Sequence, residues 1–406
     1  MRSSASSTHA PLTPPMLWDV DYYKEQDLYF YLEEVEKVLP HGRVQVVNYG
    51  EMIMLGSYSY LGLIGHPAID RAAKAAIEQY GTGTHGVRLL AGTLTIHNEL
   101  EERIARFKKA DCAITFSSGY VANLATISGL LRRGDIVLCD KLNHASIVDG
   151  CLLSQAHFRR FRHNDMDHLE KRLQEANGAA RVLVIVDAVF SMDGDVINLP
   201  EVSRLCDQYG AYLMVDEAHS IGVLGDTGHG IEEHFGLPAD AVDIKMGTLS
   251  KTIPSAGGYV AGSEQLITFL KHEARGFVFS AALPPASAAA ACAAFDVIES
   301  EPQRVRDVQR NYHYFSSALR DAGFNLLESE TAILPVMCYD ITRAVNLAHY
   351  CQQRGIFVQA VVAPVVPDGQ SRLRATVSAS HRLEDLDYCV DTLTEGAREI
   401  GGILGR

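Results

Sequence analysis

One lysine lies in a segment whose residue types suit close contact with a ligand. Lys251 ends the run Gly247-Thr248-Leu249-Ser250-Lys251, and the pair Gly257-Gly258 follows it. The two hydroxyl side chains can hydrogen-bond a phosphate, and the glycines leave room for a bound group beside the amine. A lysine amine can also bond covalently to a carbonyl carbon. For this segment taken alone, the alternative is a solvated surface lysine.

A carboxylate and two histidines come soon after apolar segments that we predict to be buried strands. Asp216 follows Ala211–Val215, His219 comes three residues later, and His144 follows Ile136–Cys139. A carboxylate at the end of a buried strand is costly unless it meets a cation. An N-cap or a salt bridge is the alternative for Asp216, and a hydrogen-bonded structural role is the simpler interpretation of either histidine alone.

A third polar cluster has the residue types of a phosphate site. Ser118-Gly119-Tyr120 follows the apolar strand Cys112–Phe116 and opens a predicted helix over Val121–Leu131. A helix N-terminus with a glycine presents free N–H groups and a positive dipole end to an anion. The alternative is an ordinary strand-to-helix turn with a serine cap.

These clusters together match what pyridoxal 5′-phosphate (PLP) requires. The cofactor needs a lysine for its aldehyde, an acid at its pyridine nitrogen and donors for its phosphate. An aromatic side chain above its ring adds a favourable contact. Lys251, Asp216, His144, His219 and Ser118-Gly119-Tyr120 supply all four. We therefore predict a PLP enzyme with a Schiff base on Lys251.

Strands and helices alternate over most of the chain, which predicts an α/β fold with a mainly parallel central sheet. Ligands in such sheets lie beyond the carboxyl ends of the strands, where the polar clusters fall. We divide the chain into a leader and N-terminal helical segment (1–50), a large PLP-binding domain (51–290) and a smaller α+β domain (291–406). Within the first part, residues 21–39 have apolar positions at helical spacing, which predicts an amphipathic helix there.

Composition excludes several classes of partner. The 406 residues carry a net charge of −14, which argues against nucleic acid or an anionic membrane as the main partner. No apolar run is long enough to predict a membrane span, and the Ser- and Pro-rich start lacks the apolar core of a secretory signal. The eight cysteines form no Cys-x-x-Cys pair, so a reduced, cytoplasmic protein without a metal site is expected.

Three familiar motifs fail on their context. Gly81–Gly86 fits G-x-G-x-x-G, but a predicted helix precedes it where a dinucleotide site needs a strand, so a loop near the active site is the better interpretation. Asp216–His219 spells a helicase string, but the chain has no Gly-Lys-Ser/Thr phosphate loop. The histidine pairs 163/168 and 229/234 lack the spacing of a zinc-protease helix.

The chain resembles the α-oxoamine synthases, a family of fold-type I PLP enzymes, from about residue 55 to 381. The strings that carry the resemblance are Phe116–Tyr120, Asp140–Ser146, Val189–Asp195, Val215–Ser220 and Gly247–Lys251. It implies that Lys251 carries the cofactor, Asp216 pairs with the pyridine nitrogen, His144 stacks on the ring and His219 meets the phenolic oxygen. It also implies contacts from the following residues: Ser118, Gly119, Tyr120, Ser191, Thr248 and Ser250 with the cofactor, Ser280 with the partner subunit's phosphate, and Tyr58 and Arg374 with the substrate carboxylate.

The resemblance further implies a reaction, a homodimer and a substrate class. Family members condense a small amino acid (serine, alanine or glycine) with an acyl thioester on CoA or an acyl carrier protein, lose CO₂ and release an α-amino ketone. The strings Asp216–Gly222 and Gly257–Gly262 look most like serine palmitoyltransferase-like members. The alternatives are an 8-amino-7-oxononanoate synthase-like enzyme or another fold-type I reaction such as transamination. Val362 and Asp187 depart from the common pattern, which has arginine and glutamate there.

Overall fold

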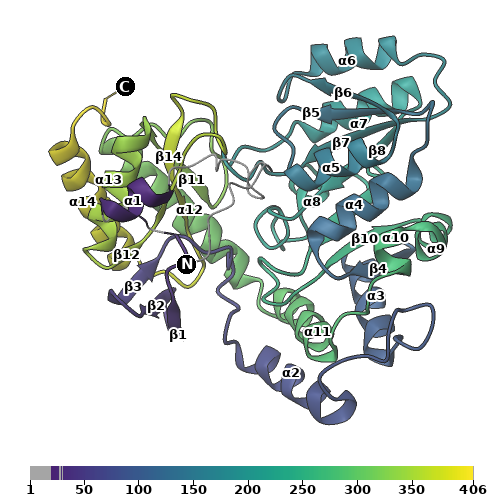
Figure 1. The fold of residues 1–406 in the computed structure, drawn as a ribbon, viewed down its shortest axis with the longest axis horizontal. Helices are drawn as coiled ribbons and strands as arrows, with labels where there is room; N and C mark the ends of the chain where they lie inside the picture. The colour runs from purple at the N-terminus through teal and green to yellow at the C-terminus, as the bar shows by residue number, and fades with distance from the viewer. Residues whose placement is uncertain (1–19, 27–28, 30, 406) are drawn as a thin grey trace, which may run out of the picture.

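The structure, a computed structural model, describes residues 20–26, 29 and 31–405. The Ser- and Pro-rich leader lies outside these residues. Two lobes stand side by side, a large lobe around a broad sheet and a C-terminal lobe that also contains the first strands (Figure 1). The chain enters and leaves the large lobe through segments that run between the two.

The large lobe is built on a seven-stranded sheet in the order β4-β10-β9-β8-β7-β5-β6. Most of these strands are buried on both faces, which explains why they read as continuous apolar runs in the sequence. The predicted α/β sheet is confirmed, and the three strands predicted over 112–116, 136–139 and 211–215 are all in place. The strands are β4 (Cys112–Phe116), β5 (Ile136–Asp140), β6 (His157–Phe161), β7 (Val182–Asp187), β8 (Tyr212–Asp216), β9 (Ile244–Thr248) and β10 (Gly258–Gly262).

Strand β10, the last strand of the sheet in chain order, is antiparallel to the others, and the loop that contains Lys251 leads into it. Strands β5 to β9 are parallel, whereas β10 pairs antiparallel with both β9 and β4. A short connection can join only antiparallel neighbours, and residues 249–257 are such a connection. Lys251 therefore lies in a tight loop at the carboxyl end of β9.

Helices pack on both faces of this sheet and bury two apolar clusters against it. The helix predicted over residues 121–131 is present, with its bounds shifted by one or two residues. The helices of this lobe are α2 (Pro67–Tyr80), α3 (Thr95–Phe107), α4 (Gly119–Leu130), α5 (Ala145–Leu153), α6 (Met166–Glu175), α7 (Leu199–Tyr209), α8 (Ile231–His234), α9 (Glu264–Glu273) and α10 (Arg275–Val278).

Two long helices, α11 (Pro285–Ser300) and α12 (Gln303–Asp321), lead from the large lobe to the C-terminal lobe (Figure 1). The alanine-rich α11 packs closely on α2 and α3, because small side chains let helices approach. The C-terminal lobe has a three-stranded sheet in the order β11-β14-β13. Its elements are β11 (Ile333–Tyr339), α13 (Ile341–Gln352), β12 (Ile356–Phe357), β13 (Gln359–Val361), β14 (Ser371–Thr376) and α14 (Leu383–Ile400).

The N-terminal segment differs from the helix predicted over residues 21–39. Of the residues described in this segment, those of α1 (Val20–Glu25) are helical, and the strands β1 (Val35–Leu39), β2 (Arg43–Val46) and β3 (Gly50–Met54) follow. The helix prediction was wrong for residues 35–39 because they form a β-hairpin with β2. His41 and Gly42 take left-handed backbone conformations in the turn between β1 and β2. Strand β3 also pairs with β12, so this part of the chain joins the C-terminal lobe. The domain boundaries at 50/51 and 290/291 stay a prediction.

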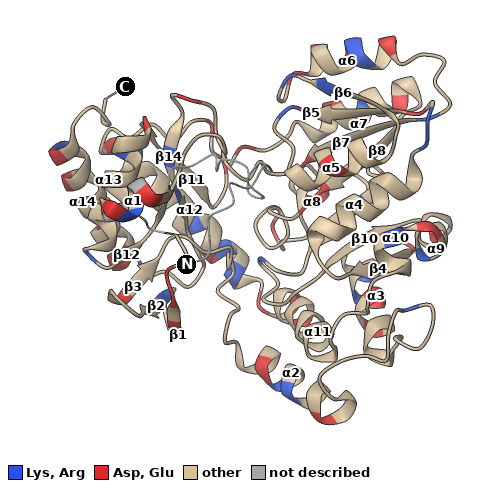
Figure 2. Cartoon of the chain, viewed as in Figure 1, with Lys and Arg blue, Asp and Glu red and all other residues tan. Residues whose placement is uncertain are grey.

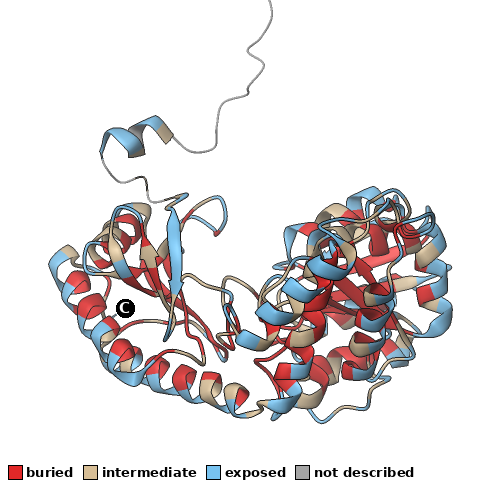
Figure 3. Cartoon of the chain, turned by 90° about the horizontal axis from the view of Figure 1, so that it is seen from below, coloured by how far each residue is buried: buried red, intermediate tan, exposed pale blue. Residues whose placement is uncertain are grey.

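Charged residues and buried residues occupy different layers of the fold. Acidic and basic residues lie mainly on helices and loops (Figure 2), while the strands of the large sheet are buried (Figure 3). In the part of the chain that the structure describes, none of the helices combines the length and apolar character that crossing a bilayer needs.

Candidate functional site

A cavity of about 230 Å³ opens at the carboxyl ends of the parallel strands. It brings together every residue predicted to contact the cofactor except Ser280. That residue lies beside Ser117 in a small neighbouring cleft, so its predicted contribution to the partner subunit stays a prediction. The cavity is lined by Ser118, Gly119, Tyr120, Asn123, His144, Ser146, Asp187, Val189, Ser191, Asp216, Ala218, His219, Met246, Thr248, Ser250 and Lys251.

Lys251 reaches into this cavity with a reactive amine. Its Nζ lies 2.7 Å from His219 Nε2, and Tyr60 Oη lies 2.6 Å from the other ring nitrogen. Burial lowers the pKa of Lys251 to about 8, against the opposing charge of Asp216. Burial also lowers the pKa of His219 well below its usual value, and the charge of Lys251 adds to this. A neutral His219 and a partly unprotonated Lys251 therefore coexist near neutral pH.

Asp216 ends β8 as a buried acid held by neutral donors. Its Oδ1 accepts a hydrogen bond from Ala218 N at 2.9 Å, and its Oδ2 accepts one from Asn123 Nδ2 at 2.7 Å. None of the lysines and arginines in the described ranges forms an ion pair with it. A buried carboxylate without a cation, facing an open cavity, suits a protonated pyridine nitrogen.

The part of the cavity lined by Ser118, Thr248 and Ser250 offers hydroxyl and backbone donors. Ser118 caps α4 and accepts from Val121 N at 3.1 Å, and the hydroxyls of Thr248 and Ser250 lie 2.9 Å apart. A Cβ added at Gly258 would lie 2.5 Å from Gly119 Cα, so only glycine lets β10 pass this close to the helix start. The helix N-terminus and the two hydroxyls form a fitting phosphate site.

His144 and Asp187 complete the wall between β5 and β7. His144 caps α5 with its Nδ1 2.7 Å from Ser146 Oγ, and its backbone N donates to Asp187 Oδ2 at 3.0 Å. Asp187 stands beside Asp216 in the sheet, and its buried Oδ1 has no hydrogen-bond partner within the described ranges. Burial, with the nearby charge of Asp216, raises the pKa of Asp187 well above its usual value. Burial and the charge of Asp216 therefore both favour the protonated form of Asp187 over its charged form.

Arg374 and Tyr58 lie at the mouth of the site. The guanidinium carbon of Arg374 lies 5.0 Å from the Tyr58 ring centroid, and Lys251 Nζ lies 5.5 Å from the same ring. Arg374 Nε donates to Ser191 O at 2.7 Å, whereas its buried Nη2 has no hydrogen-bond partner among the residues that the structure describes. Arg372, on the same face of β14, is instead held by Asp193 at 2.6 Å. Of the two arginines, Arg374 has the free donor.

Among the residues that line or support the site, Asn123, Asp187 and Tyr60 make informative contacts that were not predicted from the sequence. Asn123 follows Gly119 by one turn of an otherwise apolar helix, which is a signal that could have been used. Asp187 directly follows an apolar strand, like Asp216, and was singled out only for differing from the family pattern. Tyr60 meets His219 from a distant segment, and no spacing in the sequence indicates that contact. The loop Gly81–Gly86, expected near the active site, lies against Ala282 and outside the cavity.

The fold and this site define a fold-type I PLP-dependent transferase with a mostly parallel central sheet. The family model of aminotransferase class I and II matches residues 50–393. An 8-amino-7-oxononanoate synthase of Geobacter sulfurreducens is 44% identical over 397 residues, which is 96% of this chain and 100% of the relative. The Thermosipho melanesiensis protein of the same name is 43% identical and covers 95% and 98%. The chain therefore belongs to the α-oxoamine synthases of the aminotransferase class I and II family.

Solved structures agree with this assignment. A serine palmitoyltransferase of S. paucimobilis with bound PLP matches at a TM-score of 0.91, with 31% identity over 94% of this chain and 96% of that one. An 8-amino-7-oxononanoate synthase of Francisella tularensis matches at 0.74, with 25% identity over 86% and 98%. The protein is thus a PLP-dependent acyltransferase that uses an amino acid and an acyl thioester.

The pKa of Lys251 leads to a first prediction. Only the unprotonated amine attacks an aldehyde, so covalent capture of PLP by the cofactor-free protein should speed up as pH rises through about 8 and level off above it. Rapid-mixing absorbance between pH 6.5 and 9.5 measures this rate. The Lys251→Ala protein should lack the covalent phase. A wild-type rate that is the same at pH 6.5 and 9 would contradict the assignment.

Proposed function

We propose that the chain is an 8-amino-7-oxononanoate synthase, which joins alanine to a seven-carbon acyl thioester ending in a carboxylate. The observation that carries the proposal is the identity of 43–44% to proteins of that name over nearly their whole length. Serine palmitoyltransferase-like motifs in the sequence favoured a different substrate pair, and these relatives favour the alternative.

The carbon skeleton in the name identifies the two substrates. A decarboxylative condensation forms the bond between the ketone carbon and the carbon that carries the amine. Cutting 8-amino-7-oxononanoate at that bond leaves a two-carbon amine, which is alanine without its carboxyl group. The other piece is a seven-carbon acyl group with a terminal carboxylate, so the proposed co-substrate is a heptanedioyl thioester on CoA or an acyl carrier protein.

The site residues divide the work of this reaction. PLP, when bound, supplies the electron sink for the Cα carbanion. We assign Lys251 to carry the cofactor and to move the Cα proton, because its amine has a pKa near neutrality. Asp216 would keep the pyridine nitrogen protonated, His219 would hydrogen-bond the phenolic oxygen and His144 would pack against the ring. The phosphate is assigned to Ser118, Gly119, Tyr120, Thr248 and Ser250, with Ser191 beside the cofactor and Ser280 reaching the partner subunit's site.

We assign Arg374 to bind the carboxylate of the incoming amino acid, beside Tyr58. Its buried Nη2 has no hydrogen-bond partner in the described part of the chain, and an arginine fork suits a carboxylate. Arg374→Ala should weaken amino-acid binding by roughly 1.5–3 kcal/mol, the range for hydrogen bonds to charged groups. Spectroscopic titration with alanine measures this, and PLP affinity should be unchanged. An equal alanine dissociation constant in both proteins would leave Arg374 as a structural residue only.

A serine palmitoyltransferase-like reaction is the second candidate, and two observations favour it. The serine palmitoyltransferase match in fold is higher, with a TM-score of 0.91 against 0.74. The cavity of about 530 Å³ beside Arg374 also has an apolar wall, which suits an unsubstituted acyl chain. This wall contains Met192, Ala360, Val361, Val362, Pro364 and Val365.

A matrix of amino acids against acyl thioesters, read by mass spectrometry, separates the two candidates. Alanine, serine and glycine are each paired with heptanedioyl, octanoyl and palmitoyl thioesters of CoA and of an acyl carrier protein. The proposal expects the highest kcat/KM for alanine with a heptanedioyl thioester. A preference for serine with palmitoyl would overturn it in favour of the second candidate. We also propose a homodimer in the cytoplasm, consistent with the family.

A further inference from the structure

His163 lies outside the cofactor cavity but has an unusual position between two acids. Its Nδ1 is 3.0 Å from Asp140 Oδ1, and its Nε2 is 2.8 Å from Asp195 Oδ2. An imidazole that faces a carboxylate at each nitrogen must donate from both, so it carries a proton on each. Burial lowers the pKa of His163, but the hydrogen bonds and charges of the two acids raise it further, to about 10. The ring is therefore a cation at neutral pH.

The two acids lie on different segments of the large lobe. Asp140 ends β5 and has a fully buried side chain, and its Oδ1 also accepts from Leu142 N at 2.8 Å in the segment that leads to His144. Asp195 lies on the returning arm of a hairpin, residues 189–196, whose arms meet at the Val189–Val196 bridge. The His163 ring also contacts Phe190 of that hairpin edge-on, with centroids 4.3 Å apart. His163 thus ties the hairpin to the end of β5.

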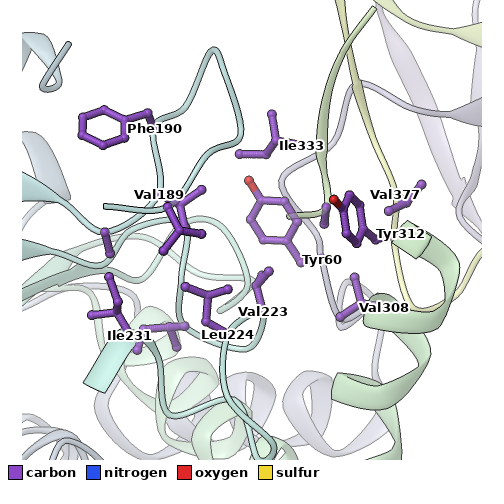
Figure 4. Packing of buried hydrophobic residues seen from close by; sticks show 14 of the residues in the cluster. Tyr60, Val189, Phe190, Val223, Leu224, Ile231, Val308, Tyr312, Ile333 and Val377 are labelled. Atoms are coloured by element: carbon purple, nitrogen blue, oxygen red, sulfur yellow. The ribbon is translucent and has the colours of Figure 1, made fainter. Parts of the chain in front are cut away.

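The tip of the hairpin holds the arginines of the C-terminal lobe. Ser191 O accepts from Arg374 Nε at 2.7 Å, and Met192 O accepts from Arg372 Nη1 at 3.1 Å. A Cβ at Gly194 would lie 2.3 Å from Ile333 O, so the hairpin fits closely against β11. Figure 4 shows Val189 and Phe190 of the hairpin on one side of this junction and Ile333 on the other. The position of Arg374 therefore depends on the position of the hairpin.

We propose that His163, bridging Asp140 and Asp195, is a positioning residue that fixes the hairpin 189–196 and through it presents Arg374 to the amino-acid carboxylate. This inference rests on the proposed role of Arg374. A glutamine at 163 carries its donors on a single nitrogen, so it cannot span the two acids as the imidazolium ring does. Asp140 would keep its hydrogen bond from Leu142 N, whereas Asp195 Oδ2 would lose the one from the ring, which frees the hairpin.

The test compares His163→Gln with His157→Gln, an exposed histidine on β6 that serves as the matched control. His163→Gln should raise the KM for alanine roughly tenfold with kcat nearly unchanged, because a carboxylate contact is weakened and the reacting groups are not touched. Hydrogen exchange of residues 189–196 in the cofactor-free protein should speed up. His157→Gln should change neither. An unchanged KM together with unchanged exchange would overturn the proposal.

Two further variants keep the outcome clear. If His163→Gln does not fold, Asp195→Asn is used instead, because it removes one side of the bridge. It should raise the KM for alanine and speed up hydrogen exchange of the hairpin, both less than His163→Gln is expected to do. If neither quantity changes, the proposal is overturned. The double variant His163→Gln/Arg374→Ala should have the alanine KM of Arg374→Ala alone, and additive effects would place the action of His163 elsewhere. If Arg374→Ala leaves the KM unchanged, the proposed anchoring fails, while faster hairpin exchange in His163→Gln still reports on the bridge.

Discussion

Replacing Lys251 by alanine should lower kcat for condensation by roughly 10⁴-fold, the upper end of what a positioned proton-transfer group contributes. The lysine loop is short and held at both ends by β9 and β10, and no other lysine lines the cavity of the described chain. The variant should fold normally, because the Lys251 amine contacts His219 but supports no part of the apolar core.

The matched control is Lys141→Ala, an exposed lysine after β5 that lies outside the cavity, and its kcat should stay within about twofold of wild type. Borohydride reduction followed by peptide mapping locates the lysine that carries the cofactor. The pyridoxyl group should be found on the peptide with Lys251 in wild type and in the Lys141 variant. A labelled peptide from elsewhere, or a Lys251→Ala enzyme that retains a tenth of its activity, would refute the assignment.

Asp216→Asn should reduce kcat by roughly 10²–10³-fold, the loss typical of removing one electrostatic group from a preorganised site. A neutral amide cannot hold the pyridine nitrogen protonated. In addition, both oxygens of Asp216 accept hydrogen bonds, from Ala218 N and Asn123 Nδ2, so an amide NH₂ would face a donor. Loss of the deuterium label from Cα-labelled alanine, followed by NMR, measures the affected step without the thioester.

Asp207→Asn, on the exposed side of α7, is the control for the loss of one carboxylate. It should exchange the Cα label at the wild-type rate. Near-normal exchange in Asp216→Asn would mean that Asp216 is structural. In that case the buried neighbour Asp187 would be the next acid to test.

The sheet and the cofactor residues could be predicted because their signals are local. Buried parallel strands read as apolar runs, and the carboxyl ends of such strands meet at one edge, so Asp216, His144 and Ser118 had to come together. Lys251 follows β9 by the same rule. Each of these residues is placed by the strand directly before it.

The features that were missed depend on distant parts of the chain. Tyr60 reaches His219, and His163 joins Asp140 to Asp195, through contacts between segments whose spacing carries no periodic signal. The N-terminal segment was read as a helix because its apolar residues also fit helical spacing. The neighbouring strand β3 pairs with β12, some 300 residues away in the sequence, and local spacing does not indicate that contact. The sequence motifs do not separate the candidate substrate pairs for a related reason, since the cofactor residues are shared by enzymes with different acyl donors.

The most direct test of the account follows each atom through one turnover with alanine labelled with ¹³C in its carboxyl group and a heptanedioyl thioester. The enzyme should release one labelled CO₂ and one free thiol for every 8-amino-7-oxononanoate formed, and the product should contain no label. Label retained in the product, or pyruvate formed without release of thiol, would contradict the account, because the first excludes decarboxylation and the second is the outcome of transamination.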